Sequence, residues 1–277
     1  MRPVAIVVPC YNEEQRLNRF AFHRFLSDEL RVRFVFVNDG SRDGTLARLQ
    51  ELQSACQPGH IDIVDLPKNG GKAEAVRHGM RHALASGADL IGFWDADLAT
   101  PLDEVPAFIR AFNRYPEIEM VVGSRLTLLG HSVQRNPKRS LLGRCFATAA
   151  SLVLGIRLQD TQCGAKMFRR SRFLAAVLEQ PFQSRWIFDV ELLARWRQLR
   201  ALGAPCLISS LYEQPLDTWV EVGGSRLKAT DFLKAPWELW QIAWSSRGPA
   251  PANVQQIANT PLELTGPSVA PVIRKVA

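Results

Sequence analysis

The sequence predicts an α/β protein in which helices cover both faces of a mostly parallel central sheet. Three observations support this prediction: short Val/Ile/Phe-rich runs alternate with helical patterns, the runs are apolar throughout, and polar clusters follow several of them. Continuous apolar runs separated by helices are typical of parallel strands that are buried on both faces. Ligands of such sheets bind beyond the carboxyl ends of the strands, so the polar clusters are the candidate site.

Five runs in residues 1–125, the first half of the domain, are predicted strands. They are VAIVVP (4–9), RFVFVND (33–39), IDIVDL (61–66), DLIGFWDAD (89–97) and MVVGSR (120–125). Helical patterns follow the second and third runs, in TLARLQELQ (45–53) and KAEAVRHGMRHALAS (72–86). Strands that alternate with helices in this way favour parallel pairing.

The second half of the domain, residues 126–220, contains basic residues, an apolar helical stretch and a predicted strand in APCLISSLYEQP (204–215). A basic, tryptophan-rich segment follows in 221–248, with Trp237, Trp240 and Trp244 on one stripe of a helix whose first turn would hold Pro236. The tail, residues 249–277, is rich in proline and sparsely charged, and we expect it to be disordered.

Composition narrows the class of protein. The formal charge of +7 favours an anionic partner, which is nucleic acid, a phosphorylated small molecule or an acidic membrane surface. Five scattered cysteines without a CxxC pair argue against a zinc site or a disulfide framework and fit a reducing compartment. We expect no signal peptide and no transmembrane helix, and therefore a soluble or peripheral body.

Two carboxylates, Asp95 and Asp97, stand at the end of the fourth run. Residues i and i+2 of a strand project from the same face, so these side chains are expected to converge. Close carboxylates repel each other unless a cation lies between them, although a pair of loop-capping aspartates is the alternative. Mg²⁺ prefers few protein ligands together with substrate phosphates, so the pair is suited to a metal–diphosphate.

Two further clusters follow strands. Asp39, in VNDGSRDGT, is expected to contact a ligand such as a ribose or base, whereas Asp43 is expected to cap the next helix. Asn69-Gly70-Gly71-Lys72 opens a helix, where free backbone N–H groups and a lysine favour an anion. The spacing of a P-loop and the GxGxxG fingerprint are both absent from the sequence.

These motifs together resemble a known family. PCYNEE (9–14), VNDGSRDGT (37–45), NGGKAEAVRHG (69–79), DADLATP (95–101), GSR (123–125), DTQCGAKMF (160–168), RWIFDVEL (185–192) and WVEVGGSRL (219–227) occur in the order found in family 2 glycosyltransferases of the GT-A fold. DADLATP and DTQCGxK are most similar to the dolichyl-phosphate glucosyltransferase and polyprenyl-phosphate glycosyltransferase branch. The resemblance covers about residues 3–235 and implies a Rossmann-like nucleotide-binding half, 1–125, followed by an acceptor-binding half, 126–220.

The resemblance also implies an inverting transfer from a nucleoside-diphosphate sugar, with UDP-glucose the favoured donor and Mg²⁺ or Mn²⁺ the cofactor. Asp97 would ligate the metal, and Asp95 would contact the metal or the nucleotide sugar. Arg125 and Gln162 would belong to a loop that contacts the sugar or acceptor. Other implied contacts to the nucleotide sugar are Pro9, Tyr11, Glu13, Asp39, Lys72, Ser225 and Arg226.

The resemblance implies that the catalytic carboxylate is Asp189, with Asp160 as the alternative. Asp189, and Glu191 beside it, lie where the family places its general base, although the surrounding residues have the pattern of a core helix. Asp160 would otherwise be a turn residue that orients the loop at Gln162. The helical spacing favours neither, and the position within the motif favours Asp189.

The acceptor is inferred from charge. A phosphate acceptor is already ionised at neutral pH and needs cations more than a base, whereas a hydroxyl acceptor gains about 10²–10⁴-fold from a general base. His131, Arg135, Lys138, Arg139 and Arg144 would supply such cations, or would form a solvated basic face.

We therefore expect transfer of glucose to a polyprenyl or dolichyl phosphate by a peripheral enzyme at the cytoplasmic face of the membrane, and no nucleic-acid partner. The tryptophans would contact the headgroup boundary. A soluble or protein hydroxyl acceptor is one alternative. A non-catalytic protein that binds nucleotide sugars at a membrane is another.

Overall fold

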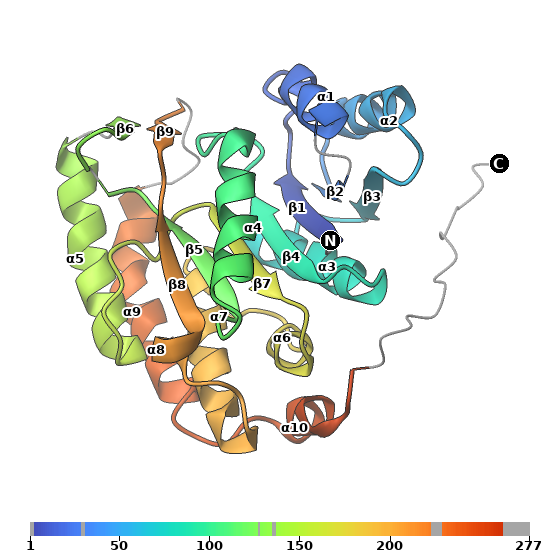
Figure 1. Cartoon of the computed structure of the whole chain (residues 1–277). Helices are drawn as coiled ribbons and strands as arrows, with labels where there is room; N and C mark the ends of the chain where they lie inside the picture. The colour runs from blue at the N-terminus through green and yellow to red at the C-terminus, as the bar shows by residue number, and fades with distance from the viewer. Residues whose placement is uncertain (1–2, 29–30, 127, 135–136, 223–228, 263–277) are drawn as a thin grey trace.

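The computed structural model of the protein describes residues 3–28, 31–126, 128–134, 137–222 and 229–262. A seven-stranded sheet runs through it in the order β3-β2-β1-β4-β7-β5-β8 (Figure 1). Its strands are β1 (Val4–Cys10), β2 (Val32–Asp39), β3 (Ile61–Leu66), β4 (Leu90–Trp94), β5 (Met120–Ser124), β7 (Ala165–Arg169) and β8 (Leu211–Pro215).

The sheet is mostly parallel, as the sequence predicts. β1 pairs in parallel with β2 and β4, and β2 pairs in parallel with β3. β7 runs antiparallel between β4 and β5, and β8 is parallel to β5. The carboxyl ends of β1, β2, β4 and β5 therefore lie along one edge, together with the amino end of β7. Because β7 comes from the second half of the chain, both halves contribute to this edge.

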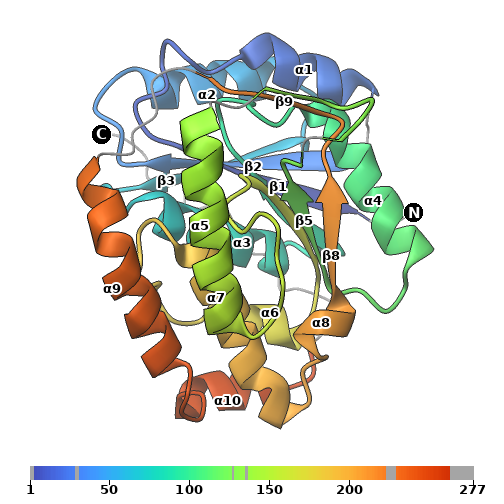
Figure 2. The same ribbon diagram turned by 90° about the vertical axis from the view of Figure 1, so that its left-hand side faces the viewer.

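Helices pack on both faces of the sheet, in the two layers that Figure 2 shows. One face is covered by α1 (Arg19–Asp28), α2 (Thr45–Ala55) and α4 (Val105–Arg114). The other is covered by α3 (Lys72–Ala85), α5 (Pro137–Leu154), α6 (Arg172–Val177), α7 (Phe188–Gln198), α9 (Ala229–Ser245) and α10 (Ala252–Asn259).

The alternation of β1 shows why its sequence is apolar throughout. Val4 and Ile6 pack into the core beneath α1, α2 and α4, whereas Ala5 and Val7 pack into the core beneath α3. Gly79 lets α3 lie close to the sheet, because a Cβ at this position would be 2.3 Å from Cγ1 of Val7. A larger residue would push the helix away from β1 and β2.

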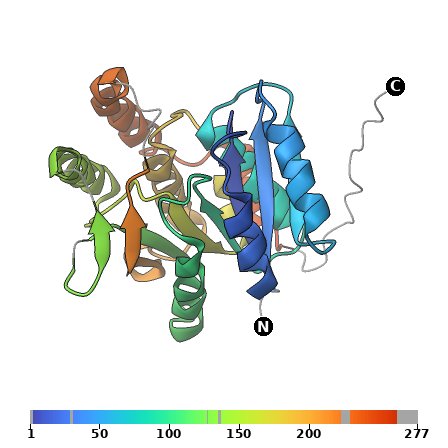
Figure 3. The same ribbon diagram turned by 90° about the horizontal axis from the view of Figure 1, so that it is seen from above.

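A second, two-stranded parallel sheet pairs β6 (Ser132–Gln134) with β9 (Thr218–Val220), which Figure 3 shows side by side. Short 3₁₀ turns lie at Leu102–Glu104 and Leu199–Leu202. The strand predicted in 204–215 begins later than expected, because Leu207–Ser210 forms the short helix α8 before β8.

Two predictions for the C-terminal part were wrong. Pro236 lies inside α9 and not in its first turn, since the helix already begins at Ala229. The expected disordered tail contains α10, whose Val254 and Ala258 are buried where the helix contacts α6. Its prolines flank the helix and do not interrupt it; Pro251 is the residue before its first turn. Residues 263–277 of the tail lie outside the described part of the chain.

In the part of the chain that the structure describes, no helix combines the length and the apolar character needed to cross a bilayer.

Candidate active site

The polar residues predicted from the sequence converge at the edge where β1, β2 and β4 end. Asp39 is the last residue of β2, Asp95 directly follows β4, and Lys72 opens α3. Asp189 lies in the first turn of α7, which packs on the same face of the sheet as α3. The sheet topology therefore gathers residues that are more than one hundred positions apart.

Asp95 and Asp97 approach each other through a turn and not through the pleat of a strand, because β4 ends at Trp94. The Leu98 N–H donates to the Asp95 carbonyl at 3.1 Å, and Leu98 has a left-handed φ of 53°. The Ala99 N–H donates to Oδ1 of Asp97 at 3.1 Å. Burial, together with the neighbouring carboxylate of Asp95, raises the pKa of Asp97. Two repelling carboxylates are thus held beside each other.

The loop before β7 is shaped to receive Asp95. The Asp95 N–H donates to the Gly164 carbonyl at 3.1 Å. A Cβ on Gly164 would lie 2.0 Å from Oδ2 of Asp95, so only glycine leaves room for this carboxylate. The glycine of the DTQCG motif therefore fixes where the Asp95 side chain can lie.

Lys72 is the counter-ion of Asp95. Its Nζ lies 2.5 Å from Oδ1 of Asp95, and the lysine side chain remains 29% exposed. Burial opposes the charged form of Lys72, but the carboxylates of Asp95, Asp189 and Asp97 outweigh it and raise the lysine pKa. Lys72 is therefore a permanent cation at the rim of the carboxylate pair.

Asp189 is a buried carboxylate paired with a buried lysine. Its Oδ1 lies 2.6 Å from Nζ of Lys166, and Nζ also donates to the Cys163 carbonyl at 2.7 Å. Burial raises the pKa of Asp189, although Lys166 and Lys72 both act in the opposite direction. A carboxylate whose pKa is raised in this way is suited to accept a proton in the site.

Asp39 organises the loop at the start of α3. Its carboxylate accepts bonds from the Gly70 N–H at 2.7 Å, the Gly71 N–H at 2.8 Å and Nδ2 of Asn69 at 2.9 Å. The prediction that these backbone N–H groups are free for an external anion was wrong, because the carboxylate of Asp39 already occupies them. Burial nevertheless raises the pKa of Asp39.

The loop after β1 is tied to the loop after β2. The Asn12 N–H donates to Oγ of Ser41 at 3.0 Å, and the buried Glu13 donates its N–H to Oγ1 of Thr45 at 2.8 Å. Pro9 and Tyr11 lie in and just after the end of β1. Asp43 accepts from the Thr45 N–H at 3.1 Å and so lies at the start of α2, although the N-cap position expected for it is held by Gly44. The predicted nucleotide contacts from β1 and β2 thus share one rim.

Asp160 is engaged by Arg125. Oδ2 of Asp160 lies 2.5 Å from Nε of Arg125, and Oδ1 lies 2.8 Å from Nη2. Oδ1 also accepts the Gln162 N–H at 3.1 Å, which orients the loop before β7. Both oxygens of Asp160 are thus held by Arg125, and Oδ1 is also held by the loop before β7, an arrangement that fits the turn-residue interpretation. Nε2 of Gln162 is buried and has no partner within the described residues.

The remaining predicted residues are placed only in part. Arg144 is exposed on α5, whereas the side chains of Lys138 and Arg139, in the first turns of α5, are outside what the structure describes. Nδ1 of His131 lies 2.8 Å from the Leu216 carbonyl and 3.5 Å from Oδ1 of Asp217. Arg135, Ser225 and Arg226 lie outside the described residues.

The donor set fits a hard divalent cation. Asp95 and Asp97 would hold it, with the diphosphate completing the coordination, since Mg²⁺ usually takes one or two carboxylates plus substrate phosphates. A cage of three or more His, Cys, Asp or Glu side chains does not occur among the described residues. The room that Gly164 leaves for Asp95 and the raised pKa of Asp97 are the two structural features that support this fit.

Two residues of the site had no predicted role. Lys166 lies on β7 and Arg185 in the loop before α7. Lys166 was visible in the sequence as a lysine inside the apolar strand AKMFR, where a buried charge needs a partner. Arg185 opens the RWIFDVEL motif, but the sequence alone did not assign it a contact.

Comparisons with known proteins agree with this geometry. Residues 5–174 match the family described as Glycosyl transferase family 2. A dolichyl-phosphate beta-glucosyltransferase of Trichomonas vaginalis is 33% identical over 251 residues, which cover 86% of this chain and 69% of that protein. The human dolichyl-phosphate beta-glucosyltransferase is 30% identical, with 82% of this chain and 70% of that protein covered.

Among solved structures, glucosyl-3-phosphoglycerate synthase of Mycobacterium tuberculosis has a similar fold. Its complex with Mn²⁺, UDP-glucose and phosphoglyceric acid superposes with a TM-score of 0.62 at 20% identity, covering 91% of this chain and 82% of that chain. The central sheet and its flanking helices are thus those of the GT-A fold.

Proposed function

Because the chain belongs to glycosyl transferase family 2, we propose that it transfers glucose from UDP-glucose to a polyprenyl phosphate such as dolichyl phosphate, at the cytoplasmic face of a membrane. The acceptor is suggested by the similarity to dolichyl-phosphate beta-glucosyltransferases. The observation that carries the proposal is the cluster of Asp95, Asp97, Lys72 and Asp189 at the end of β4.

Asp95, Asp97 and Lys72 each have a part in the proposed reaction. The acceptor oxygen attacks the anomeric carbon from the side opposite the diphosphate, a new C–O bond forms, and UDP leaves with the electrons of the broken bond. Asp95 and Asp97 would hold a divalent ion, which when bound would supply charge neutralisation to the leaving diphosphate. Lys72, which the carboxylates keep protonated, adds a second positive charge beside it. Asp189, deeper in the site, faces Lys72 and Lys166.

The experiment combines the purified protein with labelled UDP-glucose, Mg²⁺ or Mn²⁺, and a polyprenyl phosphate, and measures label in the organic phase. We expect a labelled lipid whose formation stops on chelation of the metal. Asp97→Asn removes one proposed metal ligand and should lower the rate by at least about 10²-fold. Absence of transfer with every common nucleotide sugar would refute the proposal.

A hydroxyl acceptor is the second candidate, and the raised pKa of Asp189 favours it. A hydroxyl must lose a proton during the attack, whereas an ionised phosphate does not. Asp189→Asn should therefore lower turnover about 10²–10⁴-fold with a hydroxyl acceptor and much less with a phosphate. UDP affinity, measured in parallel, separates loss of the base from loss of the donor site.

Attachment to the membrane surface is proposed through the outer face of α9. Trp237, Trp240 and Trp244 are 58%, 51% and 62% exposed, while Leu239 and Ile242 on the inner face are 6% and 1% exposed. The indole rings stack along the helix, with centroids 4.8 and 5.8 Å apart. Tryptophans on one side of an amphipathic helix are suited to the headgroup boundary.

Vesicle co-sedimentation tests this attachment. Replacing the three tryptophans with serine should leave the fold intact, since they are exposed, and should reduce binding to anionic phospholipid vesicles. Phe20→Ser is the matched control, because Phe20 is 73% exposed on α1, which packs against the opposite face of the sheet. Equal binding of the triple variant and the wild type would exclude the α9 surface.

A further inference from the structure

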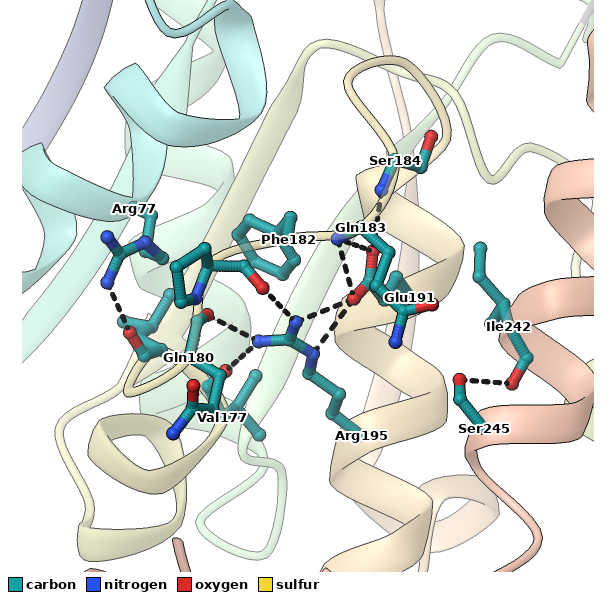
Figure 4. Close-up of polar contacts among 12 residues, drawn as sticks. Arg77, Val177, Gln180, Phe182, Gln183, Ser184, Glu191, Arg195, Ile242 and Ser245 are labelled. Atoms are coloured by element: carbon teal, nitrogen blue, oxygen red, sulfur yellow. Dashed lines mark hydrogen bonds and ion pairs between the residues drawn. The ribbon is translucent and has the colours of Figure 1, made fainter. Parts of the chain in front are cut away.

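The loop between α6 and α7, residues 178–187, has no regular structure but is anchored by hydrogen bonds to its neighbours. Glu191 on α7 accepts the N–H groups of Gln183 and Ser184 at distances between 2.9 and 3.1 Å (Figure 4). Arg195, one turn further along α7, donates to Glu191 and to the carbonyls of Val177 and Gln180. Glu191 is thus used to position this loop.

The same loop is attached to α3 and to α9. The Phe182 N–H donates to Oε1 of Glu74 on α3 at 2.9 Å. Ser184 accepts the N–H groups of Trp186 and Ile187 at 3.2 and 2.9 Å, and its own hydroxyl donates to Oε2 of Glu238 on α9 at 2.5 Å. Glu238 therefore links α9, which carries the three tryptophans, to Ser184. Ser184 is the residue directly before Arg185.

Arg185 projects from this loop over the start of α3. Its Nε would lie 3.5 Å from a Cβ on Gly71, and its Cδ and Cγ 3.6 Å away, so the side chain lies against this glycine. Gly71 has a φ of 91°, a left-handed conformation in which a side chain would be strained. Arg185 is also close enough to the Asp39 carboxylate to attract it electrostatically.

The charges around the site indicate what Arg185 can bind. Asp39, Asp95, Asp97 and Asp189 would repel an anionic donor, and the nearby cations Lys72 and Lys166 are already paired with two of them. The backbone N–H groups of Gly70 and Gly71 are occupied by Asp39. Within the described residues, the exposed guanidinium of Arg185 has no ion pair or hydrogen bond, so its donors are available.

We propose that Arg185 binds the diphosphate of the nucleotide-sugar donor, and that the Ser184–Glu238 hydrogen bond positions it over Gly71. This inference rests on the proposed function, because it assumes a nucleoside-diphosphate donor at Asp39 and Asp95. Arg185 is a binding residue, whereas Ser184 and Glu238 are positioning residues that act through it. A guanidinium presents several donors in a planar fork and matches phosphate oxygens better than an ammonium does.

The test is calorimetric titration of UDP in the presence of Mn²⁺. Arg185→Ala should weaken UDP binding roughly 10- to 100-fold, the range for losing a hydrogen bond to a charged group. Arg185→Lys should recover only part of the loss, because it keeps the charge without the fork. Arg200→Ala is the matched control: it removes the same charge from an exposed residue beyond the end of α7, and UDP binding should stay within about 2-fold of the wild type.

Variants of Glu238 test the positioning role. Glu238→Leu removes the acceptor for Ser184 and should weaken UDP binding, whereas Glu238→Gln keeps an acceptor oxygen and should restore it. In the Arg185→Ala background Glu238→Leu should have no further effect, because its influence passes through Arg185. Additive losses would overturn the positioning role.

Steady-state kinetics separates the donor from the acceptor. Arg185→Ala should raise KM for UDP-glucose and leave KM for the polyprenyl phosphate unchanged; the reverse result would overturn the assignment to the donor. If the wild type binds UDP and Arg185→Ala binds it equally well, this inference fails while the proposed function stands. If the wild type binds no nucleoside diphosphate, both fail.

Discussion

Replacing Lys166 with methionine removes one partner of the buried ion pair beneath the site while keeping most of the side-chain volume. The side chains of Lys166 and Asp189 are 1% and 6% exposed, and their charged atoms are 2.6 Å apart. Loss of one member leaves the other charge buried without compensation, which costs about 3–5 kcal/mol. Lys72 still attracts Asp189 in this variant. We therefore expect the free energy of unfolding to fall by about 3 kcal/mol, the lower end of that range.

A double variant makes this prediction specific to the pair. Lys166→Met combined with Asp189→Asn removes both charges, so its cost should fall below the sum of the single variants by about 2 kcal/mol. Urea unfolding followed by tryptophan fluorescence gives the three free energies. Arg81→Met is the control, because its pair with Glu179 has side chains 44% and 28% exposed and should contribute less than about 1 kcal/mol. Losses that add, or a single-variant loss below about 1 kcal/mol, would refute the reasoning.

The strands, and the strand ends where the site forms, could be predicted from the sequence. Each is marked by a pattern within a few consecutive residues. An apolar run followed by a polar cluster marks both a buried parallel strand and the edge where ligands bind. Asp39, Asp95 and Lys72 were therefore placed at one edge from the sequence alone, and the structure brings them there. The same reasoning gave the wrong cause for the meeting of Asp95 and Asp97, since β4 ends before them.

The partners of these residues could not be predicted, because they depend on pairings between distant segments. Lys166 meets Asp189 only because β7 inserts antiparallel between β4 and β5. Arg125 reaches Asp160 across 35 positions. The amides at the start of α3 were predicted to be free, because the sequence does not show that Asp39 would accept their hydrogen bonds.

The C-terminal predictions failed for a related reason. Proline-rich composition favours disorder only when a segment cannot bury apolar surface. The segment after α9 does bury such surface, because Val254 and Ala258 of α10 meet the core near α6. Tertiary contacts therefore override the local composition at α10, as they do at Pro236 inside α9.

Three further predictions concern residues that shape the site or the sheet. Gly164→Ala should displace the Asp95 carboxylate, which a Cβ would approach to 2.0 Å, and lower UDP–Mn²⁺ affinity at least about 10-fold, whereas Gly248→Ala, where a Cβ meets nothing within 4 Å, should not. Asp39→Asn should destabilise the fold by about 1–3 kcal/mol in urea unfolding, because one backbone N–H loses its acceptor. Glu119 should make the stability of the fold depend on pH, because burial raises its pKa from 4.5 to about 7. The folded state holds this proton more tightly than the unfolded chain, so the contribution of Glu119 to stability is complete below pH 4.5 and is lost as the pH rises through 7. Glu119→Gln cannot ionise, so its melting temperature relative to the wild type should increase between pH 5 and pH 8; a difference that stays constant over this range would show that Glu119 is not held protonated by burial.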